Sequence, residues 1–585
     1  MTVITASDGV TLAVHRYTEI DPQRPTILAI HGYPDNHHVW DGVAEELGQR
    51  YNVVAYDVRG AGESSCPASR SGYRFPQLVS DIGAVIDSLG VGQVHLLAHD
   101  WGSIQAWAAV TDEAVMGKIT SFTSISGPHL QYAGRFLRSA RTPRAAGQVA
   151  RQLASSGYIG FFLCPVVPEA AARSGLLAKI VEASERIGRS SARSQRPATQ
   201  RSIGDYVNGL HLYRQNMLAS VLSRPSQLPQ TTVPVQVLVP RKDIFVTPAL
   251  QRFTGTVLQE GPQKGRVIPI EGGHWVVTSR PDVVARLTGE WVDRNSGGAA
   301  PVDESVVRGG PREVRGKLAL VTGAGAGIGR ATAVELARQG ARKVVIVDRD
   351  LAAANETADA VRAACAEAAV YQADVSDEAA MNDLAAQVRN DHGVVDILVN
   401  NAGIAMAGRF LETTSAHWDA IVGVNVRGVI SGSRAFGAQM VERGEGGAII
   451  NIASASAFLP SKSMVAYSTT KAAVLGFSES LRADLADEGI AVTAVCPGFV
   501  NTNLAKSTVY AGMTSEQQDR AREKADAAYR RRNYTPEATA KAIVKAVRTG
   551  PPVLPVAAEA RIGYVMRRVS PSMIRLLARF DIRQK

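Results

Sequence analysis

Cysteine is scarce in this sequence, and the cysteines that occur lie far apart. They form no Cys-x-x-Cys pair and no dense framework, which excludes a disulfide scaffold and a thiolate zinc site and favours a reducing compartment. We therefore predict no metal centre. The cysteines are Cys66, Cys164, Cys365 and Cys496.

Long apolar runs are also missing. The best of them, from Tyr158 to Val167, is too short to cross a bilayer and is followed at once by Pro168. The first residues, Met1 to Thr5, lack the basic segment and the long apolar core of a secretory signal. Both absences favour a cytoplasmic protein.

Motifs of nucleic-acid recognition are absent as well, although Lys and Arg outnumber Asp and Glu and give a formal charge of +10. No zinc-finger spacing, RNA-binding aromatic motif or long basic run accompanies that charge, so we expect no nucleic-acid partner. The chain is long, however. Its 585 residues, 45% of them hydrophobic, are enough for two domains of ordinary α/β size.

In the first half, apolar strands alternate with helical segments, which is typical of a mostly parallel, doubly wound sheet. Residues 2–17 are expected to form a hairpin. Residues 129–230 interrupt the alternation with Ser-, Arg- and Ala-rich helical patches, and we interpret them as an inserted cap in a domain of residues 1–295. The expected strands are Pro25–Ile30, Asn52–Tyr56, Val94–Ala98, Ile119–Ser126, Val233–Pro240 and Gly265–Ile270.

The strand over residues 94–98 ends in His99-Asp100-Trp101-Gly102, and a helix is expected from Trp101 to Ala109. Small residues around one central side chain are typical of a nucleophile elbow, a sharp strand-to-helix turn that lifts this side chain above the sheet. Here it is the carboxylate of Asp100 instead of a serine hydroxyl. A carboxylate attacks an alkyl carbon by displacement and leaves an ester that water must hydrolyse.

Two later strand ends supply the other members of a triad. Asp243 follows the strand that ends at Pro240, and His274 follows the last strand in Gly272-Gly273-His274-Trp275. The order of nucleophile, acid and histidine along the chain is that of the α/β-hydrolases. Together with His31-Gly32-Tyr33-Pro34, these motifs resemble the epoxide hydrolase branch of that fold over about the first 295 residues.

The resemblance implies a role for each residue of the triad. Asp100 would attack an oxirane carbon, His274 would deprotonate water for hydrolysis of the ester, and Asp243 would orient the imidazole. The backbone amides of Tyr33 and Trp101 would bind the oxyanion.

Opening of an epoxide also needs an acid for the ring oxygen, and in this family two cap tyrosines supply it. Tyr213 matches one of them closely and Tyr158 matches the other more loosely, with Tyr206 as the competing assignment. A haloalkane dehalogenase would share the aspartate nucleophile, but it usually has Asn where Tyr33 stands and lacks the tyrosine pair. The expected substrate is therefore a small-molecule or lipid epoxide, with a haloalkane as the alternative.

A polar linker is predicted over residues 296–315. The strand of residues 317–321 then leads into a glycine-rich loop that opens a helix (Ala331–Gln339), and a second strand (Lys343–Val347) ends in Asp348. Such glycines let the backbone approach a pyrophosphate at a helix N-terminus, while the acid holds a ribose diol. The cofactor-binding loop residues are Gly323, Gly327, Ile328 and Gly329.

The choice between NAD and NADP depends on the residues around this second strand. Asp348 should repel a 2′-phosphate, which favours NAD, whereas Arg330 and Arg349 nearby weaken that preference. NAD is the predicted cofactor, and NADP is the alternative.

Further motifs resemble those of the short-chain dehydrogenases/reductases, in the family order, over about residues 316–555. Tyr467 and Lys471 are four residues apart and share one helix face, so the ammonium favours the phenolate that exchanges a hydroxyl proton. The resemblance implies that Ser454, with Ser456 as the alternative, bonds the substrate oxygen and that Asn425 positions Lys471 and a water. The other implied cofactor contacts are Asp374 and Val375 at adenine, Asn401 on the ribose side and Thr502 at the carboxamide.

Residues 556–585 are Arg-rich, and a helix that starts at Ser570-Pro571 would carry Ile574, Leu577 and Phe580 roughly along one side. Such a basic amphipathic helix could lie on the cytoplasmic face of an anionic membrane, contact a second subunit or be a plain surface helix, and these interpretations remain open. We also expect the dehydrogenase half to form a homo-oligomer.

The predicted fold class is therefore α/β in both halves, and the arrangement resembles the hydrolase–dehydrogenase fusions of mycobacteria and other actinobacteria, which implies lipid modification. Because tethering raises the local concentration of an intermediate, we expect both halves to act on one substrate. The alternative is that one half is catalytically silent and serves as a binding or membrane-docking module.

Overall fold

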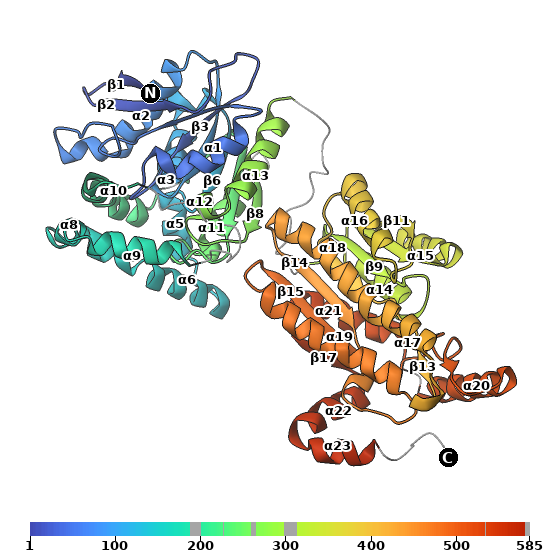
Figure 1. The fold of residues 1–585 in the computed structure, drawn as a ribbon. Helices are drawn as coiled ribbons and strands as arrows, with labels where there is room; N and C mark the ends of the chain where they lie inside the picture. The colour runs from blue at the N-terminus through green and yellow to red at the C-terminus, as the bar shows by residue number, and fades with distance from the viewer. Residues whose placement is uncertain (188–199, 226, 259–264, 298–312, 533, 579–585) are drawn as a thin grey trace. The chain divides into compact units, whose positions relative to one another are not determined.

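The computed structural model describes the chain except for residues 188–199, 226, 259–264, 298–312, 533 and 579–585 (Figure 1). It divides into two compact units, Met1–Val307 and Arg308–Lys585. Most of the predicted linker lies outside the described residues. Within the described part of the chain, no single helix is long and apolar enough to cross a membrane, and only one helix pair, bent by 89°, passes that test jointly.

The first unit is built on an eight-stranded sheet of order β1-β2-β4-β3-β5-β6-β7-β8 (Figure 1). β2 pairs with β1 and with β4 in antiparallel fashion, and the other neighbours are parallel. The strands are β1 (Thr2–Thr5), β2 (Thr11–Arg16), β3 (Thr26–Ile30), β4 (Asn52–Tyr56), β5 (Val94–His99), β6 (Ile119–Ile125), β7 (Val235–Pro240) and β8 (Arg266–Ile270).

Strands β3, β4, β5 and β7 are buried along their whole length, which explains why they are continuous apolar runs. Helix α1 packs on α13, and α2 packs on α3. The helices and turns beside the sheet are η1 (His37–Trp40), α1 (Asp41–Leu47), η2 (Arg70–Tyr73), α2 (Phe75–Ser88), α3 (Trp101–Ala109), α4 (Glu113–Met116), α11 (Pro248–Leu258), α12 (Val276–Ser279) and α13 (Pro281–Asn295).

The predicted cap is a set of helices between β6 and β7, in which the long helix α10 packs against α5, α7 and α8. A capping box formed by Ser202 and Asp205 fixes the first turn of α10. One face of α10 is buried at Tyr206, Leu210 and Tyr213, the spacing that aims one stripe of a helix inward. The cap helices are α5 (Leu130–Leu137), α6 (Pro143–Ser155), α7 (Gly157–Leu163), α8 (Val167–Arg173), α9 (Leu176–Glu185) and α10 (Ile203–Leu222).

The second unit has a seven-stranded, fully parallel sheet of order β11-β10-β9-β12-β14-β15-β17. The order reverses between β9 and β12, and ligands of such sheets bind at that point, beyond the carboxyl ends of the strands. The strands are β9 (Leu318–Thr322), β10 (Lys343–Asp348), β11 (Glu367–Gln372), β12 (Ile397–Asn400), β14 (Gly447–Ile452), β15 (Ile490–Pro497) and β17 (Val553–Val556), with a separate pair β13 (Met406–Ala407) and β16 (Val509–Tyr510).

Helices surround this sheet, and a π-helical turn interrupts one of them where Asn425 lies. The helices and turns are α14 (Gly327–Arg338), α15 (Leu351–Ala363), α16 (Glu378–His392), η3 (Phe410–Glu412), α17 (Ser415–Val422), η4 (Gly423–Arg427), α18 (Gly428–Arg443), η5 (Ala455–Ala457), α19 (Val465–Asp484), α20 (Ser515–Arg532) and α21 (Pro536–Thr549).

The C-terminal segment forms two helices, α22 (Ala558–Val569) and α23 (Pro571–Leu577), of which only the second was predicted. Helix α22 is docked on its unit, because Glu559 accepts the Phe499 N–H at 2.7 Å. Ile574 is 4% exposed and packs inward, while the Leu577 side chain and Phe580 lie outside the described residues.

Candidate active sites

Asp100 occupies a strained turn between β5 and α3. Its backbone has φ +50° and ψ −123°, a conformation that a residue with a side chain rarely adopts and that is found at functional turns. At two glycines around this turn, neighbouring backbone atoms lie too close to leave room for a side chain. A Cβ at Gly102 would lie 2.1 Å from the Ile30 carbonyl oxygen, and one at Gly127 would lie 2.2 Å from that of Asp100.

The three predicted triad side chains lie together at the carboxyl ends of the strands. His274 Nε2 is 3.4 Å from Asp100 Oδ1, and its Nδ1 is 3.1 Å from Asp243 Oδ1. All three residues are buried. Asp243 is fixed in turn, because its Oδ1 accepts the N–H groups of Phe245 and Val246 at 2.9 and 3.0 Å.

The charges of this triad compensate one another. Burial alone would lower the pKa of His274, but the carboxylates of Asp243 and Asp100 outweigh it and raise that pKa to about 10. Burial pushes the pKa of Asp243 upward, and the imidazolium and the two backbone amides more than reverse this effect. The resting site therefore holds an imidazolium between two carboxylates.

The predicted oxyanion amides flank the nucleophile. The Tyr33 N–H donates to Asp100 Oδ2 at 3.0 Å, and Trp101 is the first residue of α3. A Cβ at Gly32 would lie 2.7 Å from the Trp101 nitrogen, so the loop that carries Tyr33 passes directly over the elbow. Two backbone N–H groups at a helix start suit a developing negative charge.

Two of the three candidate cap tyrosines lie close together beside Trp101, the residue that follows Asp100. The rings of Tyr158 on α7 and Tyr213 on α10 are 6.2 Å apart, and Tyr213 also packs edge-on against Trp101 at 4.9 Å. Burial and the Asp100 charge raise the pKa of both phenols, which keeps them protonated, the form of a proton donor. Tyr206 instead bonds the Arg201 side chain.

A buried ion network that the sequence did not predict connects the cap to the catalytic loops. Asp35 Oδ2 accepts the indole N–H of Trp275 at 3.0 Å, and Arg201 bridges Asp35 at 2.6 Å and Glu185 at 2.5 Å. Asp35 and Trp275 directly follow motifs that the sequence shows, whereas Arg201 and Glu185 carry no local signal. The network holds the cap over the histidine loop.

His99, which precedes the nucleophile, is a second residue that positions this loop. It is fully buried, and its Nε2 donates to the His274 carbonyl oxygen at 2.9 Å. Burial lowers the pKa of His99 and keeps the ring neutral. His99 is therefore a positioning residue that fixes the backbone of the catalytic histidine.

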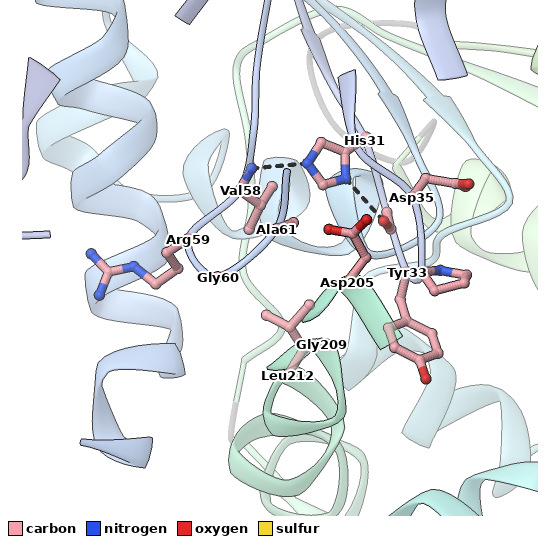
Figure 2. A pocket seen from close by; sticks show the side chains of 12 residues that line it. His31, Tyr33, Asp35, Val58, Arg59, Gly60, Ala61, Asp205, Gly209 and Leu212 are labelled. Carbon is pink, nitrogen blue, oxygen red and sulfur yellow. Dashed lines mark hydrogen bonds between the residues drawn. The ribbon is translucent and has the colours of Figure 1, made fainter. Parts of the chain in front are cut away.

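Figure 2 shows a small pocket beside the loop that carries Tyr33, and its volume of about 10 Å³ is the space of about one water molecule. His31 lies at its wall, where Nε2 accepts the Val58 N–H and Nδ1 donates to the Gly32 carbonyl oxygen, both at 2.9 Å. These bonds use both ring nitrogens of a neutral imidazole. His31 thus shapes the loop behind the oxyanion amides.

In the second unit the glycine-rich loop adopts the geometry that a dinucleotide requires. Gly323 and Gly327 have φ of +61° and +55°, and a Cβ at Gly329 would lie 2.1 Å from the Gly323 carbonyl oxygen. Helix α14 begins at Gly327, four residues before the predicted start, so its N-terminus lies within the loop. Ile328 packs partly against the adjacent core.

The carboxylate at the end of β10 completes the cradle, the name we give to the glycine-rich loop of residues 323–329 together with the start of α14. Asp348 Oδ2 accepts the Gly325 N–H at 2.8 Å. Arg330 is held against the same loop, with its guanidinium 2.7 Å from Glu356 and its Nε bonded to the Gly325 carbonyl oxygen. The loop, the helix start and the carboxylate fit the pyrophosphate and ribose of a nicotinamide dinucleotide.

Four other predicted cofactor contacts lie at the same edge of the sheet. The Asn401 amide donates to the Thr322 and Gly323 carbonyl oxygens, both at 3.0 Å, so it holds the glycine loop. A Cβ at Gly327 would lie 3.3 Å from Thr502. The remaining two are Asp374, whose pKa is lowered by bonds from Ser376, and the buried Val375.

The four predicted catalytic residues of this unit surround the end of β14. Ser454 follows this strand, and the turn after it packs on α19, which carries Tyr467 and Lys471. Lys471 Nζ is 5.8 Å from the Tyr467 ring centre. Asn425 and Lys471 both lie beside Gly403, where a Cβ would meet their polar atoms at 3.2 and 3.4 Å.

Lys471 is a buried cation that no carboxylate neutralises within the described structure. Its Nζ donates to the Ile452 carbonyl oxygen at 2.9 Å. Burial lowers the pKa of Lys471 to about 8. An ammonium held in this way favours any nearby group that can become an anion, which here is the phenol of Tyr467.

Comparison with known proteins places the whole chain. A family model for the alpha/beta hydrolase fold matches residues 25–156, and one for short chain dehydrogenase matches residues 317–511. "Probable oxidoreductase EphD" of Mycobacterium tuberculosis is 37% identical over 603 residues, covering 99% of this chain and 98% of the relative. The chain belongs to this family of fusions of an α/β-hydrolase with a short-chain dehydrogenase.

Other relatives match the dehydrogenase part of the fusion. The 2,3-dihydro-2,3-dihydroxybenzoate dehydrogenase of Bacillus subtilis is 35% identical over 33% of this chain and 72% of its own. A solved short-chain dehydrogenase/reductase from Burkholderia phymatum in complex with NAD is 32% identical, covering 45% of this chain and 96% of its own, with a TM-score of 0.42. A 3-ketoacyl-(acyl-carrier-protein) reductase from Brucella melitensis complexed with NADH is also 32% identical, covering 41% and 96%, with a TM-score of 0.36.

Proposed function

We propose that the first unit of this fusion hydrolyses an epoxide to a vicinal diol through an ester on Asp100. The observation that carries the proposal is a buried carboxylate on a strained elbow, with an imidazolium 3.4 Å away and two protonated phenols beside it. A hydroxyl nucleophile would suit acyl transfer, whereas a carboxylate displaces at an alkyl carbon. The second unit oxidises or reduces an alcohol–ketone pair with a nicotinamide cofactor.

In the first step an Asp100 oxygen forms a bond to one oxirane carbon as the carbon–oxygen bond of the ring breaks. Tyr158 and Tyr213 bond the leaving oxygen and supply its proton. Their buried, protonated state supports this role. The products are a hydroxyl group on the substrate, a neutral ester on the enzyme and one tyrosinate, which regains its proton when the His274 imidazolium gives up its own.

Formation of the ester also prepares the second step. Asp100 loses its charge, and that charge is one of the influences that hold the pKa of His274 near 10. The imidazole therefore loses its proton more readily, and it can then deprotonate the attacking water. Asp243 stabilises the imidazolium that forms, and the Tyr33 and Trp101 amides stabilise the oxyanion.

In the second unit Tyr467 takes or gives the hydroxyl proton, Ser454 bonds the substrate oxygen, and Lys471 favours the phenolate. A bound nicotinamide dinucleotide would supply the hydride chemistry. The glycine loop, Asp348 and Thr502 would hold the dinucleotide, and the carboxylate at the ribose favours NAD over NADP. Asn425 fixes the neighbouring loop, because its side chain bonds both the N–H and the carbonyl oxygen of Ile404.

We also propose that the two units act in sequence on a lipid-like substrate and that the dehydrogenase unit forms a homo-oligomer. The diol made by the first unit would be oxidised to a hydroxyketone by the second. The support is the covalent linkage of two units that each hold a full catalytic set.

Single-turnover hydrolysis in heavy-oxygen water tests the ester. The first turnover should give a diol without solvent label, because its new oxygen comes from Asp100, and later turnovers should carry the label. Label in the first diol would contradict the ester, and Asp100→Ala should make no diol. Halide release from haloalkanes without diol formation would favour dehalogenation instead.

A further inference from the structure

The positive charge of this chain is concentrated in the cap. Residues 129–230 contain fourteen Lys and Arg residues but four Asp and Glu residues, a net charge equal to the +10 of the entire chain. The remainder of the protein is therefore neutral on balance. A charge so confined to one part of the sequence is a local feature and points to a local partner.

Most acidic residues of the cap form ion pairs or hydrogen bonds within the first unit. Glu185 pairs with Arg201 at 2.5 Å and Glu169 pairs with Arg214 at 2.6 Å. Asp205 accepts the N–H groups of Ser202 and Gly62, and only Glu182 of the four is exposed. The exposed cations of α6, α8 and α9 and their flanks are Arg141, Arg144, Arg151, Arg173, Lys179 and Arg186.

Apolar side chains are exposed among these cations. Of the thirteen exposed large hydrophobic residues described in the first unit, ten belong to the cap. On α9, Leu176 and Ile180 are 54% and 51% exposed, one turn apart, while Leu177 and Val181 are buried on the opposite face. Helix α9 is thus apolar on both faces, although only one face has the core to pack against.

We propose that this outer cap face, formed by α6, α8 and α9, docks on an anionic lipid surface. The interspersed cations match the negative headgroups, and the aliphatic side chains between them reach the acyl boundary. The centre of an interface between proteins is instead depleted in charged residues and enriched in aromatic ones. The exposed row on α9 is aliphatic, with Lys179 between Leu176 and Ile180.

Helix α7 joins this face to the catalytic centre. Phe161 is exposed at 37%, whereas Phe162 is buried and packs on Tyr213 at 5.1 Å between ring centres. Tyr158 on the same seven-residue helix lies next to Phe162, at 5.3 Å. An epoxide dissolved in the lipid would meet α7 before it reached Asp100. This delivery step rests on the proposed epoxide hydrolysis, but the docking does not.

Co-sedimentation of the full chain with vesicles tests the docking. Vesicles of phosphatidylglycerol mixed with phosphatidylcholine should bind the wild-type chain, and binding should weaken as salt screens the charges. Phosphatidylcholine alone should bind much less. The triple variant Arg173→Gln, Lys179→Gln and Arg186→Gln should lower the partition coefficient about 100-fold, since each basic residue contributes about 1 kcal/mol at an anionic surface.

The double variant Leu176→Ser and Ile180→Ser should also weaken binding, and the double variant Ile562→Ser and Val565→Ser in α22 is its matched control. Absence of wild-type binding would overturn the proposal. So would binding that survives the cap variants but disappears in the α22 variant, since the C-terminal helices would then be the contact.

Turnover of two epoxides separates docking from catalysis. The cap variants should retain hydrolysis of the soluble substrate styrene oxide, which shows that they are folded, and lose turnover of a long-chain epoxide embedded in the vesicles. If the wild-type chain binds vesicles but opens neither epoxide, the proposed function fails and the docking stands. Equal turnover of the embedded epoxide by all variants would contradict delivery through the cap.

Discussion

Each unit buries one cation at its catalytic centre, and the two are held in opposite ways. His274 lies between two carboxylates that raise its pKa to about 10. Lys471 donates to the Ile452 carbonyl oxygen, no carboxylate neutralises it in the described part of the chain, and burial lowers its pKa to about 8. The protonated form of the buried base is therefore stabilised in the first unit and destabilised in the second.

The difference fits the chemistry that we propose for each unit. In the proposed hydrolase mechanism the carboxylate is the nucleophile, so its charge would be balanced before substrate arrives and consumed when the ester forms. In the mechanism proposed for the dehydrogenase unit the anion would be created on Tyr467 during turnover. An ammonium without a carboxylate partner favours that ionisation.

The largest expected effect is the separation of the two activities. Asp100→Ala should reduce diol formation by at least about 10⁴-fold and leave hydride transfer unchanged, because it removes the nucleophile of one unit alone. Tyr467→Phe should do the reverse. Parallel assays for diol and for NADH check both variants, and a loss of both activities in either variant would show that the sites are not independent.

Stability should respond in opposite directions when each cation is removed. His274→Gln should destabilise the first unit by about 3–5 kcal/mol, since it leaves two buried carboxylates unbalanced. Lys471→Met should stabilise the second unit by about 2 kcal/mol at neutral pH, because a costly buried charge disappears. Thermal unfolding of the full chain measures both, with NAD identifying the second unit's transition by shifting it. A destabilised Lys471→Met variant would contradict the comparison.

The pH dependence of stability should differ between the units in sign. The His274 pKa is raised from 6.5, so its contribution is complete below pH 6.5 and is lost as pH rises toward 10. The Lys471 pKa is lowered from 10.5, so its cost is complete below pH 8 and disappears as pH rises to 10.5. Between pH 8 and 10 the first unit should lose stability while the second gains it. The His274→Gln and Lys471→Met variants should each flatten one of the two slopes.

A smaller effect is expected where a neutral side chain orients the hydrolase acid. Gln251 Nε2 donates to Asp243 Oδ2 at 3.1 Å. Gln251→Leu should lower kcat for diol formation about tenfold through a less well-placed acid, with little change in KM. Gln251→Asn should not restore kcat, because the shorter asparagine side chain cannot reach the Asp243 carboxylate. An unchanged kcat would show that the two backbone amides suffice to hold Asp243.

Residues beside strand ends could be predicted from the sequence, because a buried parallel strand is a continuous apolar run and its last residue fixes the place of the next side chain. Asp100, Asp243, His274 and Asp348 are of this kind. Arg201 could not, since its partner Asp35 is 166 residues away and no local pattern connects them. The π-helical turn that presents Asn425 has no periodicity of its own to detect.

Other departures have a similar cause. The start of α14 was expected after the glycines, whose helix propensity is low, but the packing of Gly329 on Gly323 rewards an earlier start. The sequence predicts one helix in the C-terminal segment, yet a second helix, α22, precedes it and is docked by the contact of Glu559 with Phe499. In both places tertiary contacts outweigh the local preference of the sequence.

The bond from Lys471 to Ile452 has an evolutionary consequence. Ile452 is the last residue of β14, a strand paired on both sides with β12 and β15, so the ammonium takes its position from the interior of the sheet. Among the described residues, those from 506 to 532, which follow the last strand of that trio, accept no hydrogen bond from this ammonium. Exchange of that segment between related enzymes should therefore leave the position of the ammonium unchanged, which makes the segment tolerant of redesign.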